Sequence, residues 1–513
     1  MGDSSKGFGN GTQKKLRVSS LSRVMQKQTC IKLMQILKNG MESFHKARSF
    51  GRRDLLKTIA LGGAAAAIPA LHAEPSGGSS ERKKVRGIVF MVSDGMSPGV
   101  LTLAEAFSQL TRQRSTRWWQ LYNQPESARG LMDNAAANSL VTDSAAASSA
   151  WGGGERVNNG SINIRPDGSE LTPIAKILND QGTKIGLVTT ATITHATPAG
   201  FATVSKSRGD EDHIAPQYLN RVDVLLGGGT GHFSADKRLD KRDLFADFSK
   251  AGYEVLHDRD ALLKSRSEKL LGTFTNGHLP FSLDRQHSEE LRAKIPSLEE
   301  MAEAALVRLL GSGSPFLLQI EGARIDHAAH LNDIGGLLAD QLAFDDALSR
   351  VQILLEKHPD VLLVVTSDHG NANPGLNGTG VSYADTNSCF ARIARFRASH
   401  EKLLEQWNVQ KGTKASQITE MIQKQMGINL RKEETAALFE IVADHPVLEW
   451  SEQMSKPEGL LGQFLGNHTG IGWTGTSHTS DPTLISAIGP ECQRFSGLMK
   501  NTEVFTQFRE LLG

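Results

Sequence analysis

Short apolar runs alternate with longer amphipathic stretches along the chain from about residue 85 onward. Six runs have the length and the Val, Ile and Leu content of strands buried on both faces. They lie at 87–93, 184–190, 222–228, 316–322, 361–367 and 484–489. Helical periodicity occupies 98–110, 171–181, 297–310 and 334–356. This alternation predicts an α/β fold, a three-layer sandwich with a large, mostly parallel central sheet flanked by helices.

The pattern changes between about residues 376 and 470. Val- and Ile-rich runs disappear there, and charged helical patterns such as ASHEKLLEQW and ASQITEMIQKQM take their place. This change predicts a helical cap inserted into the main domain. We therefore expect a catalytic domain made of 85–375 plus 471–513 and a cap insertion at 376–470.

The N-terminal part of the chain has a different composition from the rest. Residues 1–73 hold 13 Lys and Arg against 3 Asp and Glu, a charge of +10, whereas the whole chain carries +1. The remaining residues therefore carry −9. An acidic body argues against nucleic-acid-specific binding, which normally uses a basic face.

The segment from Ser49 to Ala73 has the layout of an export signal. Arg52 and Arg53 precede an apolar stretch of about 13 residues that ends in small residues, as in a twin-arginine signal peptide. The stretch is too short to span a bilayer, which takes roughly 20 residues. An Ala-rich buried helix is the alternative. We predict an N-terminal extension with a signal peptide over 1–73, and a periplasmic or secreted mature protein with no stable membrane insertion.

Side chains with metal-binding chemistry follow several of the predicted strands. They are Asp94, His195, Thr197, Glu321, Asp326, Asp368 and His369. Each alone could be a helix cap or turn residue. The carboxyl ends of parallel strands meet at one sheet edge. Carboxylates gathered there would repel one another unless cations separate them. Together these residues predict a metal cluster.

The ligand types narrow the choice of metal. Asp326 and His330 are four residues apart, which places them on one face of a helix. Carboxylates and imidazoles suit Zn²⁺ and Mg²⁺. The cysteines, Cys30, Cys389 and Cys492, match no thiolate metal motif and are too few for a disulfide scaffold. Pairing of Cys389 with Cys492 stays open.

A candidate nucleophile stands at the start of an Ala-rich helical pattern. Ser144 follows Thr142 and Asp143 directly. A helix N-terminus offers unpaired N–H groups and a partial positive charge, which favour an alkoxide or a phosphate. The alternative is that Asp143 and Ser144 only cap the helix.

The motifs that carry these residues resemble those of the alkaline phosphatase family. They are VTDSAAA (141–147), FMVSDGM (90–96), HATPAG (195–200), EGxxIDxxxH (321–330), TSDH (366–369) and GTSHTS (475–480). The similarity runs from about Val85 to Asp368 and returns from about Thr474 to the end. It implies hydrolysis of small phosphate monoesters to an alcohol and inorganic phosphate through a phosphoserine at Ser144. A homodimer is possible.

The resemblance also implies a site with two Zn²⁺ and one Mg²⁺. One zinc would be held by Asp326, His330 and His478, and the other by Asp94, Asp368, His369 and the Ser144 hydroxyl. Asp94, Thr197 and Glu321 would hold the magnesium. Two zinc ions roughly 4 Å apart clamp the entering and leaving oxygens of an in-line displacement.

Arg208 falls where the family has its phosphate-binding arginine, which Asp143 would orient. A planar guanidinium grips two phosphate oxygens at once. His195 and His327 replace the Asp and Lys of the best-known bacterial form and match animal-type enzymes. The resemblance implies that His195 lies at the third metal, which could then be zinc, and that His327 binds substrate.

Four other functions fit parts of the pattern. A sulfatase would need a Cys- or Ser-x-Pro-x-Arg segment, whereas alanines follow Ser144. A phosphoglycerate mutase-like enzyme shares the DHGN sequence at 368–371 but has no use for an export signal. A phosphodiesterase of the same superfamily usually has a Thr nucleophile and lacks the Thr197 and Glu321 pair. A non-enzymatic metal- or phosphate-binding module would lack the serine, the arginine or a ligand.

Overall fold

A computed structural model describes residues 84–407, 412–445 and 448–513. The N-terminal extension and signal segment predicted at 1–73 lie outside the described residues. Within the described chain, no helix has the length and apolarity needed to cross a bilayer. Cys389 and Cys492 are both free thiols, so they do not pair.

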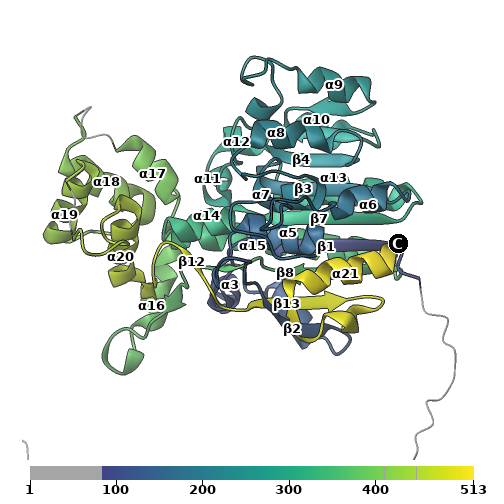
Figure 1. Ribbon diagram of the computed structural model, residues 1–513. Helices are drawn as coiled ribbons and strands as arrows, with labels where there is room; N and C mark the ends of the chain where they lie inside the picture. The colour runs from purple at the N-terminus through teal and green to yellow at the C-terminus, as the bar shows by residue number, and fades with distance from the viewer. Residues whose placement is uncertain (1–83, 408–411, 446–447) are drawn as a thin grey trace, which may run out of the picture. The chain divides into compact units, whose positions relative to one another are not determined.

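Ten strands of the described chain form the central sheet, in the order β14-β2-β13-β8-β1-β7-β3-β4-β6-β5 (Figure 1). Their bounds are β1 (Gly87–Ser93), β2 (Ala128–Asp133), β3 (Lys184–Thr192), β4 (Val224–Gly228), β5 (Glu254–Leu256), β6 (Leu270–Thr273), β7 (Phe316–Gly322), β8 (Val361–Thr366), β13 (Thr483–Ile488) and β14 (Gly497–Lys500). All pairings are parallel except those of β13, which runs antiparallel to β8 and β2. The predicted large, mostly parallel sheet is confirmed.

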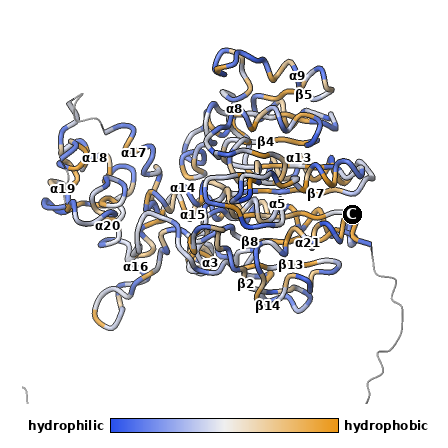
Figure 2. The backbone as a smooth tube through the Cα atoms, viewed as in Figure 1, coloured by the Kyte–Doolittle hydropathy of each residue, from blue (hydrophilic) through white to orange (hydrophobic). Residues whose placement is uncertain are grey.

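Burial on both faces explains the continuous apolar runs. In β1, Val89 and Met91 belong to the core on one face, while Ile88, Phe90 and Val92 belong to the core on the other. Figure 2 shows apolar stretches along central strands such as β7 and β8. The three-layer arrangement is therefore confirmed.

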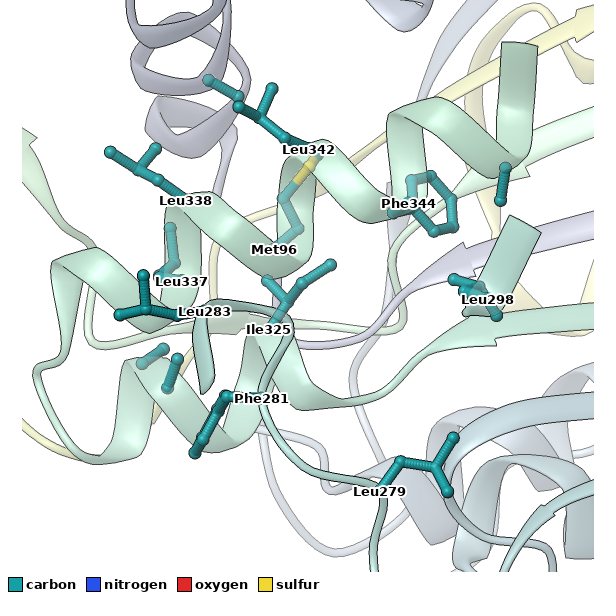
Figure 3. Packing of buried hydrophobic residues seen from close by; sticks show 14 of the residues in the cluster. Met96, Leu279, Phe281, Leu283, Leu298, Ile325, Leu337, Leu338, Leu342 and Phe344 are labelled. Atoms are coloured by element: carbon teal, nitrogen blue, oxygen red, sulfur yellow. The ribbon is translucent and has the colours of Figure 1, made fainter. Parts of the chain in front are cut away.

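Helices with apolar stripes cover the sheet. The predicted helices appear as α3 (Pro98–Arg112), α6 (Ile174–Asn179), α13 (Leu298–Gly311) and α15 (Ile334–Leu355). Helix α6 begins later than the predicted residue 171, because its N-cap Pro173 is itself in an extended conformation. Leu337, Leu338 and Leu342 of α15 pack with Ile325 in one core (Figure 3).

The described part of the chain between 376 and 470 consists mainly of helices, as the sequence predicts. It contains α16 (Thr386–Phe390), α17 (His400–Gln406), α18 (Ala415–Met426), α19 (Lys432–Val442) and α20 (Pro457–Thr469). The two ends of this segment lie together, because β10 (Gly375–Leu376) pairs antiparallel with β11 (Ile471–Gly472). Such closure is the geometry of an insertion. The exact domain boundaries stay predictions.

Helices α5 (Ser144–Gly153) and α7 (Ala196–Ala202) approach each other closely through glycines. A Cβ added at Gly152 would lie 2.0 Å from the Gly200 carbonyl oxygen. We expect Gly152→Ala to lower the free energy of unfolding by about 1–3 kcal/mol or more, because a packed interior resists added volume. Thermal unfolding measures this effect.

The matched control is Gly311→Ala at the end of α13, where an added Cβ meets nothing within 4 Å. Alanine favours helix over glycine, so this variant should unfold at or slightly above the wild-type temperature. Equal unfolding temperatures for the two variants would contradict the close contact between α5 and α7.

Candidate active site

The predicted metal-binding side chains lie at the carboxyl ends of adjacent strands. In the order β8-β1-β7-β3, Asp368 follows β8, Asp94 follows β1, Glu321 stands near the end of β7, and His195 comes shortly after β3. The four side chains thus share one sheet edge. The structure forms three groups of potential ligands there, each with ligand atoms within 4.8 Å of one another.

The first group is Asp326, His330 and His478. Asp326 and His330 belong to helix α14 (Arg324–His330), and the two histidine Nε2 atoms lie 3.0 Å apart. Each ring faces a backbone carbonyl with Nδ1: His330 contacts Thr476 at 2.7 Å and His478 contacts Thr142 at 2.9 Å. A carbonyl only accepts, so both Nδ1 atoms carry protons. The Nε2 atoms therefore face each other and Asp326, where a cation could bind both. Although burial opposes it, the nearby Asp326 carboxylate raises the pKa of His330 to about 9, so a cation would displace a proton from this ring.

A short antiparallel pairing brings His478 to this group. β12 (His478–Thr479) pairs with β9 (Gly370–Asn371), which directly follows Asp368 and His369. Asn371 also donates from Nδ2 to Asp326 Oδ1 at 2.7 Å. The rings of His369 and His478 stack with centroids 3.7 Å apart. The first and second groups are thereby held side by side.

The second group is Asp94, Asp368 and His369, all fully buried. His369 Nε2 lies 3.0 Å from Asp368 Oδ2 and 3.7 Å from Asp94 Oδ1. The Ser144 hydroxyl oxygen lies 3.2 Å from the same nitrogen. Asp368 Oδ1 accepts the backbone N–H of Gly95 at 3.0 Å, which fixes the carboxylate. The serine thus contacts this group directly.

The third group is Asp94, His195 and Glu321. Glu321 Oε2 accepts the Thr189 hydroxyl at 2.5 Å, whereas the Thr197 hydroxyl is buried without a partner in the described chain. His195 Nε2 accepts from Arg208 at 2.9 Å, because a guanidinium only donates. That nitrogen is therefore engaged by the arginine, and Nδ1 is the ring's buried atom without a partner in the described chain.

Buried carboxylate oxygens without partners test whether cations fit here. Both oxygens of Asp94 and Oε1 of Glu321 make no hydrogen bond within the described chain, and the Oδ2 atom of Asp368 contacts only the His369 ring there. An unpaired buried charge costs several kcal/mol. Burial, and then the charge of Asp368, raise the pKa of Asp94 well above its usual value. Burial raises the pKa of Glu321 to about 7. Divalent cations would hold these groups ionised, so the residues fit a metal cluster.

Ser144 begins α5, and Asp143 caps it. One Asp143 oxygen accepts the N–H of Ala146 at 2.9 Å, while the other contacts Arg208 at 3.1 Å. The carboxylate therefore caps the helix and orients the arginine at once. The capping alternative is true of Asp143 but does not exclude the second contact.

Three imidazoles gather beside Arg208. The ring of His195 lies 5.7 Å from those of His327 and His278, and the latter two lie 4.5 Å apart. Burial lowers the pKa of each ring, and the nearby guanidinium groups of Arg208 and Arg324 lower it further. Both effects favour the neutral form of each ring.

Sequence analysis did not single out His278 or Arg324. His278 follows β6, whose four residues are too few to give a clear periodic signal, although its place after a strand was a usable signal. Arg324 lies inside the motif at 321–330, where no metal chemistry drew attention to it.

Comparison with known proteins agrees with this geometry. The family model for alkaline phosphatase matches residues 85–513. Alkaline phosphatase 3 of Bacillus subtilis is 30% identical over 448 residues, covering 84% of this chain and 90% of that protein. Alkaline phosphatase 4 of the same organism is 28% identical over 445 residues, covering 82% and 88%.

A solved structure shares the fold as well. The crystal structure of Thermus thermophilus alkaline phosphatase superposes with a TM-score of 0.79 at 33% identity, covering 87% of this chain and 95% of that one. The family match spans every group of potential ligands described above. The protein therefore belongs to the alkaline phosphatase family of phosphomonoesterases.

Proposed function

We propose that the protein hydrolyses small phosphate monoesters through a phosphoserine intermediate at Ser144. One observation carries this proposal: the Ser144 hydroxyl lies 3.2 Å from His369 Nε2 within a cluster of buried carboxylates, several of whose oxygens make no hydrogen bond in the described chain. A serine so placed has its oxygen beside the cations that the cluster would hold. It also stands at a helix N-terminus, which favours negative charge.

Two Zn²⁺ and one Mg²⁺ are the cations we propose. One zinc would be held by Asp326, His330 and His478. The second would be held by Asp94, Asp368, His369 and Ser144. The magnesium would be held by Asp94, Thr197 and Glu321, with His195 beside it. Such ions supply Lewis acid chemistry and neutralise charge on the transferring phosphoryl group. Engagement of His195 Nε2 by Arg208 supports a third site built mainly from oxygens, which suits magnesium.

The chain's own residues then divide the work. The Ser144 oxygen attacks phosphorus while its hydroxyl proton passes to solvent, and the bond from phosphorus to the leaving oxygen breaks as that oxygen takes up a proton to become the alcohol. Water later breaks the bond between phosphorus and the serine oxygen, which restores the hydroxyl and releases phosphate. Arg208 grips two phosphate oxygens while Asp143 keeps its guanidinium in place. His327 lies in the same imidazole cluster, where it contributes a neutral donor to the substrate.

Trapping the intermediate tests this proposal. Acid quenching of turnover with a ³²P-labelled monoester should leave label on the protein, and peptide mapping should assign it to Ser144. Rapid turnover with no label on Ser144 would contradict the phosphoserine, while no turnover at all would contradict the activity itself.

Arg208→Ala should weaken inhibition by inorganic phosphate by roughly tenfold to a hundredfold, because a charge-assisted bidentate contact is lost. The inhibition constant against p-nitrophenyl phosphate measures this change. Arg165→Ala is the matched control, since Arg165 pairs with Glu155 outside the site. Unchanged inhibition in Arg208→Ala would contradict its role.

We propose export through the twin-arginine route to the periplasm or the medium. The paired arginines and the short apolar stretch of the N-terminal segment support this route. Changing Arg52 and Arg53 together to lysine should retain the enzyme inside the cell. Unchanged export of that variant, measured by fractionation, would count against the signal.

A further inference from the structure

Arg324 is a buried cation beside the imidazole cluster. Its side chain is 3% exposed, and its guanidinium stacks on the Phe281 ring at 3.7 Å from the centroid. Phe281 belongs to the same core cluster as Ile325 of α14, and both side chains are labelled in Figure 3. A guanidinium taken out of water needs a compensating charge and hydrogen-bond acceptors. The groups that accept hydrogen bonds from Arg324 therefore indicate its role.

One contact runs to the active site. Arg324 Nη1 lies 2.7 Å from His327 Nδ1. Because the guanidinium carries donors only, Nδ1 must accept, and the neutral His327 ring then holds its proton on Nε2. Within the described chain, His327 Nε2 makes no hydrogen bond, so its N–H is left for a ligand.

The other contact runs to the cap. Arg324 Nη2 donates to both carboxylate oxygens of Glu401 at 2.8 Å. Glu401 belongs to the first turn of α17, and its side chain is 43% exposed. Its carboxylate supplies the negative charge that balances the buried Arg324 guanidinium. Arg324 thus bridges the cap helix and His327.

Residues at the start of α17 attach the cap to the catalytic domain through other contacts, away from the cluster of His195, His278 and His327. The Ser399 hydroxyl donates to Asp284 at 2.5 Å, and the backbone N–H of His400 donates to Asp333 at 2.8 Å. Because these contacts already attach the helix, the ion pair of Arg324 with Glu401 is not its sole attachment. The same guanidinium also holds His327, so the ion pair links the cap to the imidazole cluster.

We propose that Arg324, held by Glu401 of the cap, is a positioning residue that fixes His327 with Nε2–H as the donor to the substrate phosphate. This inference rests on the proposed phosphatase function. It gives the cap a direct link to the catalytic site. His278, whose Nδ1 accepts the backbone N–H of Thr192 at 3.1 Å, holds the same tautomer beside it.

A double-mutant cycle in the full-length, metal-loaded enzyme tests the link. Arg324→Met should lower kcat/KM for p-nitrophenyl phosphate by roughly tenfold, about 1.4 kcal/mol of transition-state stabilisation. In a His327→Gln background the same change should have an effect of less than about twofold, because the positioned group is gone. Additive losses would overturn the proposal.

Variants of α17 separate positioning from attachment. Glu401→Gln should lower kcat/KM severalfold, while Glu405→Gln, at an exposed position of the same helix, should leave it unchanged. Ser399→Ala should lower thermal stability but keep kcat/KM within about twofold. An equal loss of activity in Ser399→Ala and Glu401→Gln would show that only cap attachment matters, and would overturn the proposal.

A spectroscopic measurement needs no activity. In protein labelled with ¹⁵N-histidine, the His327 signals are those absent from His327→Gln. The wild type should show a protonated Nε2 and an unprotonated Nδ1, and Arg324→Met should show a mixture of tautomers. A protonated Nδ1 in the wild type would overturn the proposal. Because this result is independent of turnover, it is distinguishable from failure of the phosphatase function.

Discussion

Replacing Ser144 with alanine should reduce hydrolysis of p-nitrophenyl phosphate by roughly a thousandfold or more, because removal of a nucleophile eliminates the covalent pathway. The lost hydroxyl is 1% exposed and directly contacts His369 Nε2. Alanine adds no volume, and Asp143 still caps the helix through Ala146. Steady-state kinetics measures the loss in kcat.

The control for this variant is Ser149→Ala on the same helix. Ser149 is equally buried and accepts the backbone N–H of Asn163 at 2.9 Å, away from the ligand groups. This variant should lose some stability but keep its turnover. Elemental analysis should find the wild-type metal content in Ser144→Ala. Undiminished turnover in Ser144→Ala would remove the serine from the mechanism.

The positions of the predicted strand ends were enough to predict the carboxylates of the site. Asp94, Glu321 and Asp368 each stand at or just after a continuous apolar run, and the parallel sheet carries all three to one edge. This inference needed only periodicity and the rule that strand ends meet. The sheet and its order of layers followed from the same signal.

The resemblance to a family supplied what periodicity could not. His478 reaches the first ligand group through β9 and β12, which are two residues each and leave no pattern in the sequence. Strand β13 looked like the parallel strands, because a run buried on both faces reads alike in either direction. Short strands such as β5 and β6 were not predicted, because three or four residues are too few to give a periodic pattern in the sequence.

The contacts of Arg324 were beyond either approach. Its partner Glu401 is 77 residues away in a segment that matches no motif, and only the folded cap brings the two together. The role of a buried guanidinium can be inferred once the groups that accept its hydrogen bonds are known. The sequence identifies the arginine but not these acceptor groups.

Removing bound metal with EDTA should abolish turnover and also lower the thermal stability of the protein. The buried carboxylates of Asp94, Glu321 and Asp368 would lose the cations that balance their charge. The facing Nε2 atoms of His330 and His478 would lose the cation that they share. A site with free metal a thousandfold above its dissociation constant stabilises the fold by about 4 kcal/mol. Differential scanning calorimetry before and after chelation measures the shift.

Adding zinc or magnesium back to the metal-free protein distinguishes the contributions of the three metal sites. Zinc alone should restore most of the stability, because it refills the first and second ligand groups, and zinc plus magnesium should restore full turnover. Ser144→Ala should show the same fall in unfolding temperature on chelation while remaining inactive throughout, since its carboxylates and imidazoles are unchanged. Elemental analysis must show that chelation emptied the protein. An emptied enzyme that kept both its turnover and its unfolding temperature would mean that the buried carboxylates are neutralised by protons, and the metal cluster would have to be abandoned.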